Sequence, residues 1–73
     1  MLNIYVRFET EKKANEFYNV LVENERQEEF ARSTSRSFAV GFPDDAPEDE
    51  CQDEVINLMW QLGYVASVDY VVY

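Results

Sequence analysis

Apolar and polar residues alternate along the first stretch of the chain, Leu2–Phe8. Every second residue is apolar, and the residues between them are Asn3, Tyr5 and Arg7. Because successive side chains of a strand point to opposite faces, this alternation places all the apolar side chains on one side. The pattern predicts a strand with one buried face.

After Thr10 the apolar residues follow a helical spacing of i, i+3, i+4 and i+7. These apolar positions are Ala14, Phe17, Tyr18 and Leu21. Thr10 is a residue type that caps helix N-termini with its side-chain oxygen. We therefore expect an amphipathic helix that begins after Thr10 and ends near Asn24.

The next segment allows two interpretations. Arg36–Phe42 alternates like a strand, and Ser33–Ser35 has the composition of a turn. Glu28–Arg32 would then be the first arm of a hairpin, which is the interpretation that we favour. In the alternative, the first helix extends through Phe30 and the sheet has three strands.

A second helix is predicted after Pro43. Asp45 and Glu48 have the spacing of a capping box, and Pro47 suits the first turn of a helix. Gly63 suits a left-handed residue just beyond the helix end. The apolar stripe of this helix consists of Cys51, Val55, Leu58, Met59 and Leu62.

Tyr64–Tyr73 alternates again and predicts a long final strand. The order strand, helix, strand, strand, helix, strand resembles the ferredoxin-like βαββαβ fold of the α+β class. It implies a four-stranded antiparallel sheet with two helices on one face, in one small domain over residues 1–73. The three-stranded βαβαβ arrangement is the alternative, and neither fold implies an activity.

The charge of the chain is strongly acidic. Its 73 residues include fifteen acids, six bases and no histidine, for a formal net charge of −9. Such a charge repels nucleic acid and anionic membranes and attracts basic surfaces. The single cysteine and the lack of a signal-peptide pattern indicate a cytoplasmic protein, in the host cytoplasm if the protein is viral.

Few residues suit a metal ion, a cofactor or catalysis. Without histidine and with only Cys51, the chain cannot assemble a zinc or iron–sulfur site, and the EF-hand spacing is absent. Small acylphosphatases share the predicted fold, but Arg7–Thr10 stands where their glycine-rich phosphate loop is expected. We predict a non-enzyme without cofactors, and the alternative is catalysis by carboxylates at a subunit interface.

One strand resembles a nucleic-acid motif. Arg36–Phe42 is similar to the aromatic strand of RNA-recognition domains, and Tyr5 could supply the second aromatic side chain. Ser37 replaces the usual glycine, however, and Val40 replaces an aromatic residue. Because phosphate contacts supply much of the affinity and bases are few, we predict no direct binding of nucleic acid.

The acidic stretch Asp44–Glu54 supplies the candidate interaction surface, since seven of its eleven residues are acids. On a helical wheel, Asp49, Glu50, Asp53 and Glu54 centre opposite the apolar stripe, which also fits an ordinary solvated face. Between Glu48 and Glu54 they give roughly one charge per 2 Å, close to the one per 1.7 Å of duplex DNA. Trp60 and Ile56 lie beside these acids, and Trp60 could be an apolar anchor or could pack half-buried across the first helix. The predicted partner-binding residues are Asp44, Asp45, Asp49, Glu50, Asp53, Glu54 and Trp60.

We therefore expect an inhibitor that binds a basic, nucleic-acid-binding protein or nuclease by imitating phosphate charge. Small phage inhibitors of host defence, of the anti-CRISPR or anti-restriction type, have this character. The alternative is an oligomerising ferredoxin-like module. A nearly uncharged final strand at a sheet edge also predicts a homodimer or strand addition by a partner.

Overall fold

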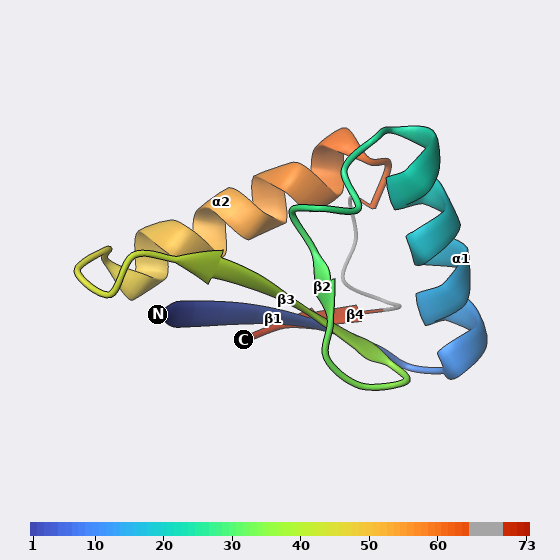
Figure 1. The fold of residues 1–73 in the computed structure, drawn as a ribbon, viewed down its shortest axis with the longest axis horizontal. Coiled ribbons are helices and arrows are strands. Elements are labelled where there is room, and N and C mark those ends of the chain that lie inside the picture. The colour runs from blue at the N-terminus through green and yellow to red at the C-terminus, as the bar shows by residue number, and fades with distance from the viewer. Residues whose placement is uncertain (65–69) are drawn as a thin grey trace.

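The computed structural model describes residues 1–64 and 70–73 and shows a single antiparallel sheet with two helices (Figure 1). The sheet has four strands in the order β2-β3-β1-β4. Both helices lie on one side of it, with α2 along the sheet and α1 at one end (Figure 1). This is the predicted ferredoxin-like α+β arrangement. The elements are β1 (Leu2–Phe8), α1 (Glu11–Glu23), β2 (Ala31–Arg32), β3 (Ser37–Phe42), α2 (Glu48–Gln61) and β4 (Tyr70–Val72).

Strand β1 is the centre of the sheet and has the predicted bounds. It pairs with β3 from Leu2↔Phe42 to Arg7↔Ser37, and with β4 on its other side. Ile4, Val6 and Phe8 are buried on the helix side, as the alternation predicts. The opposite face of the sheet carries no helix (Figure 1).

Aromatic rings fill the space between the helices and the sheet. The Phe17 ring lies 5.0 Å from Phe8, 5.2 Å from Phe38 and 5.4 Å from Phe30, measured between centroids. Tilted and edge-to-face pairs at such distances are favourable beyond simple burial. Phe38 therefore belongs to the core, so the strand that resembles an RNA-binding motif turns its aromatic side chain inward.

Helix α1 begins as predicted, with the Lys13 amide donating to Thr10 Oγ1 at 3.2 Å. Ala14, Phe17 and Leu21 are buried, but Tyr18 remains 43% exposed, so its predicted burial is wrong. Tyr18 lies at one edge of the apolar stripe. The exposure of Tyr18 shows that this edge of the stripe is not covered by the core.

Both helices end in the same hydrogen-bonding motif. Gly63, with φ of +95°, follows α2, and the Tyr64 amide donates back to the Met59 carbonyl at 2.8 Å. After α1, Glu25 takes the equivalent left-handed position with φ of +58°, and the Arg26 amide donates to the Leu21 carbonyl at 2.8 Å. These are Schellman motifs. The one after α1 uses a residue that the left-handed region disfavours.

The predicted hairpin is present, but its first arm is shorter than Glu28–Arg32. Only Ala31–Arg32 forms strand β2, because a turn occupies the preceding residues, with the Glu29 amide donating to the Arg26 carbonyl at 3.0 Å. Phe30 is buried in the core directly before the strand. Because α1 ends at Glu23 and a turn precedes Phe30, the alternative in which the first helix extends through Phe30 is wrong.

The start of α2 differs from the prediction. The capping box of Asp45 and Glu48 is absent: Pro47 is the N-cap residue, and no side chain caps the helix. A helix capped by Asp45 would need helical geometry at Ala46, which proline at the next position disfavours. Pro47 therefore precedes the helix rather than lying in its first turn, and the Cys51 amide donates to the Pro47 carbonyl at 3.0 Å.

The final strand lies at the sheet edge beside β1, as predicted, and the described part of β4 is Tyr70–Val72. Tyr64 is not part of a strand, because its ring packs into the core 5.2 Å from the Phe17 ring. Residues 65–69, which the prediction also assigned to this strand, lie outside the described residues. Tyr70 is buried and Val71 is exposed, in agreement with the predicted faces.

Candidate interaction surface

The acidic face of α2, defined here as Asp49, Glu50, Asp53 and Glu54, points to solvent. All four side chains are exposed. On the opposite side of the helix, Cys51, Val55 and Met59 are buried against the sheet. The predicted orientation of α2 is therefore confirmed, with its apolar stripe inward and its carboxylates outward.

No basic side chain within residues 1–64 and 70–73 forms an ion pair with the acidic face of α2. Two of the six basic side chains pair with other described acids: Lys13 lies 3.5 Å from Glu9, and Arg26 lies 3.1 Å from Glu29. Exposed like charges on one helix repel each other, and a cationic partner would relieve that repulsion. The surface therefore has unsatisfied charge available for a partner.

Asp44 and Asp45, which were also predicted to bind the partner, lie in the loop between β3 and α2. Both are exposed, but the amino group of Met1 forms an ion pair with Asp44. Since both groups of this pair are largely exposed, its net stabilisation is small. The loop before α2 therefore carries two exposed carboxylates, of which Asp44 pairs with the amino group of Met1 and Asp45 forms no ion pair with another described residue.

Trp60, the predicted anchor, is 55% exposed near the C-terminal end of α2. It follows Asp49 and Asp53 at helical spacing along one flank of the helix. Slightly more than half of its surface is therefore open to solvent, and this exposure fits both the predicted anchor and the half-buried alternative. An exposed tryptophan beside carboxylates is a common layout of an interface anchor.

Cys51 lies under the acidic face of α2 and is buried. Burial raises the pKa of its thiol, and the negative charges of Glu54, Glu50 and Glu48 raise that pKa further. A thiol held in its neutral form is a poor nucleophile. The residue therefore acts as a small core side chain, as its place on the apolar stripe predicts.

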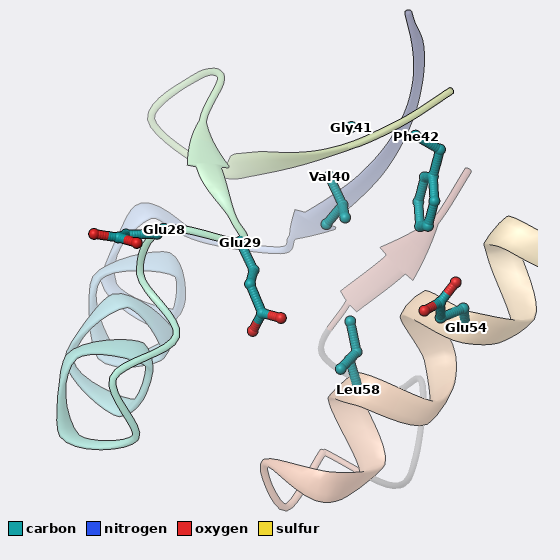
Figure 2. A pocket seen from close by; sticks show the side chains of 7 residues that line it. All are labelled: Glu28, Glu29, Val40, Gly41, Phe42, Glu54 and Leu58. Carbon is teal, nitrogen blue, oxygen red and sulfur yellow. The ribbon is translucent and has the colours of Figure 1, made fainter. Parts of the chain in front are cut away.

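A pocket of about 300 Å³ opens between α2 and β3, and sequence analysis did not predict it. Its lining residues are Glu28, Glu29, Val40, Gly41, Phe42, Glu54 and Leu58. Figure 2 shows Val40, Phe42 and Leu58 between the carboxylates of Glu29 and Glu54. The only sequence signal is the i, i+4 spacing of Glu54 and Leu58, which places an acid and an apolar residue on one helix flank. The helix packing places β3 opposite this flank, and sequence spacing does not specify that packing.

The part of the chain that the structure describes holds no group of three metal-ligating side chains suited to a metal ion. Its buried side-chain nitrogen and oxygen atoms all have hydrogen-bond partners. Neither of the described helices has the length and apolar run needed to cross a bilayer. The exposed acids and the pocket beside them are thus the features on which a functional proposal can rest.

Comparisons with protein-family models, curated proteins and solved structures find no match for this chain.

Proposed function

We propose that this protein is a non-enzymatic inhibitor that binds a basic, nucleic-acid-binding protein through the acidic face of α2. The carboxylates would occupy the partner's phosphate-binding surface and exclude its nucleic acid. This proposal places the protein in the cytoplasm and in the anti-CRISPR or anti-restriction class of phage anti-defence inhibitors.

One observation carries the proposal. Four carboxylates, on Asp49, Glu50, Asp53 and Glu54, project from one helix with no internal cation among the residues described. With a rise of about 1.5 Å per residue, the row approaches the linear charge density of a nucleic-acid backbone. Pairing with lysines and arginines would release counterions from both surfaces, as phosphate binding does.

The proposal is tested by affinity capture from a bacterial lysate on three immobilised proteins, with quantitative mass spectrometry. These are the wild type, a variant with Asp49→Asn, Glu50→Gln, Asp53→Asn and Glu54→Gln, and a control with Glu9, Glu11, Glu16 and Glu23 each changed to Gln. Both variants lose four negative charges, but only the first changes α2. We expect the wild type and the control to capture nucleic-acid-binding proteins that the α2 variant does not capture.

Added duplex DNA should release the same proteins, because DNA and the acidic face of α2 would compete for one basic surface. Salt at 0.5 M should also release them, because it shortens the Debye screening length to about 4 Å. The proposal would be contradicted if the α2 variant captured the same proteins in the same amounts as the wild type. Equal loss from both variants would show that net charge alone causes capture, and would also contradict it.

A second function, an oligomerising module, is favoured by the uncovered face of the sheet. None of the described strand residues is acidic, although the chain carries a charge of −9. Two copies would repel each other least through this face, or through the free edge of β4. Sedimentation at low and high salt separates the two functions, because self-association of this kind should not weaken when salt is added.

A further inference from the structure

We propose that the pocket between α2 and β3 receives an arginine side chain of the basic partner. This inference rests on the proposed function and specifies how one residue of the partner is recognised. The pocket is at the small end of the range for ligand sites, about 300–1,000 Å³, and therefore suits one long side chain rather than a cofactor.

The inner part of the pocket is apolar. Val40 and Phe42 enter it from β3, and Leu58 approaches from α2 (Figure 2). Leu58 and Phe42 are only partly buried, so the pocket leaves apolar surface open to water. The methylene stem of an arginine can cover such surface while its charged head stays near the rim.

The rim of the pocket is acidic. Three of the lining residues are glutamates and none is basic. Glu29 and Glu54 approach from opposite sides, whereas the carboxylate of Glu28 points away (Figure 2). Glu54 forms no ion pair with the residues that the structure describes. It belongs both to the pocket and to the acidic face of α2, so a partner docked on that face is positioned to reach in.

The protein itself places a guanidinium between α2 and the connection after α1, which carries Glu29 of the pocket rim. Arg26 contacts Glu29 at 3.1 Å and donates to Gln61 Oε1, near the end of α2, at 3.3 Å. An arginine thus already bridges the connection after α1 and helix α2 at one point. The second oxygen of the Glu29 carboxylate can accept a further donor, because a carboxylate has about four acceptor sites.

Arginine fits this site better than lysine does. A guanidinium is planar and weakly hydrated, can donate to two carboxylates at once, and stacks on aromatic rings such as that of Phe42. An ammonium is a compact, strongly hydrated charge that gains less from an apolar wall. Anionic groups, including nucleic-acid phosphates, would be repelled by the glutamates of the rim.

The test uses the full chain and a small probe, Nα-acetyl-arginine methylamide, in a titration followed by amide chemical shifts in two-dimensional NMR. We expect saturable shifts centred on residues 40–42, Glu54 and Leu58. The neutral citrulline analogue has the same stem, so it should bind about tenfold more weakly, as loss of a charge-assisted hydrogen bond implies. The lysine analogue should also bind more weakly than the arginine probe.

Glu54→Gln should weaken binding of the arginine probe by about tenfold, whereas Glu48→Gln should change its affinity by less than about twofold. Glu48 is a matched control because it is an exposed carboxylate on the same helix but outside both the pocket and the acidic face of α2. Both substitutions are at exposed positions, and preserved dispersion of the spectrum confirms that each variant is folded.

Three results would overturn the inference: shifts spread evenly over the acidic face of α2, equal binding of the citrulline analogue, or equal weakening by both substitutions. None of them would contradict the proposed function, since capture of a basic protein by the exposed acids needs no pocket. Conversely, failure of the capture experiment leaves the result of the titration unchanged, so the two failures are distinguishable.

Discussion

Tyr5 and Tyr73 stack on the face of the sheet that neither helix covers, with ring centroids 5.5 Å apart and an angle of 25° between the rings. Their backbones form a reciprocal pair, in which each amide donates to the other carbonyl at 2.7 and 2.9 Å. The guanidinium of Arg7 lies 5.9 Å from the centroid of the Tyr73 ring. These contacts fasten the end of the chain beyond β4 to the central strand.

Tyr73→Ala is expected to destabilise the fold by about 1 kcal/mol, because it removes the aromatic pair and the cation–π contact. Urea unfolding followed by far-UV circular dichroism measures the change. Tyr18→Ala is the control, since Tyr18 is also exposed but lies on a helix, where alanine is well tolerated. An equal loss in the two variants would show that the stacked pair contributes nothing specific.

Glu25→Gly should stabilise the protein by about 0.5 to 1 kcal/mol, because glycine removes the cost of the left-handed backbone after α1. Gly63→Ala should do the reverse at the end of α2 and destabilise by about 1 kcal/mol. An added Cβ at Gly63 meets no atom within 4 Å among the described residues beyond its chain neighbours, so that effect would come from the backbone alone.

Glu25→Gln separates charge from backbone geometry, since it removes the charge and keeps the strained conformation. Thermal unfolding of all three variants at one pH makes the comparison. A stabilisation by Gln as large as that by Gly would attribute the effect to charge repulsion instead.

Thr10→Ala should cost about 1 kcal/mol of stability, because the Lys13 amide loses the side-chain oxygen that caps α1. Asp45→Ala should change stability by less than about 0.5 kcal/mol, because Asp45 is exposed and does not cap α2. Equilibrium urea unfolding compares them. A loss of similar size for Asp45→Ala would mean that the capping box forms in solution after all.

The stability of the fold should decrease at alkaline pH. Burial raises the pKa of Cys51 and of Tyr70 in the folded protein, so the folded state binds these protons more tightly than the unfolded chain does. The stability that these two raised pKa values contribute is fully present below the pKa values of the unfolded chain, about 8.5 for cysteine and 10 for tyrosine. It is lost as the pH rises through the pKa values of the folded protein.

Urea unfolding between neutral pH and pH 11 measures this dependence (pH 11 being about one unit above the ordinary tyrosine pKa). Tyr70→Phe should flatten the upper part of the profile, although it also loses the hydrogen bond that the phenol donates to the Tyr64 carbonyl at 2.7 Å. Cys51→Ala should flatten the lower part. Unchanged profiles in both variants would assign the alkaline loss to other groups.

The order of the elements was predictable because most of them carry a local signal. The alternation of Leu2–Phe8 gives β1 its bounds, and Thr10 marks the start of α1. The direction of the acidic face of α2 also follows from helical periodicity alone, because the apolar stripe must face the sheet. Local patterns of this kind do not depend on where the rest of the chain lies.

The errors lie where a neighbouring residue or a packed ring overrides the local signal. Pro47 disfavours helical geometry at Ala46, so the capping box of Asp45 cannot form. Phe30 is drawn into the core and shortens β2, and Tyr64 packs against Phe17 instead of beginning the final strand. The positions of Phe30 and Tyr64 depend on tertiary contacts that sequence spacing does not encode, whereas the effect of Pro47 on Ala46 is local.

The sequence by itself determined the order of the elements, the inward stripe of each helix and the density of outward charge, because these depend on residue type and period. Only the tertiary structure decided that Glu54 and Leu58 face Val40 and Phe42 across a pocket, and that Tyr5 meets Tyr73. Such pairs join segments far apart in the chain. Their distance is set by how the helices pack on the sheet, which local periodicity cannot specify.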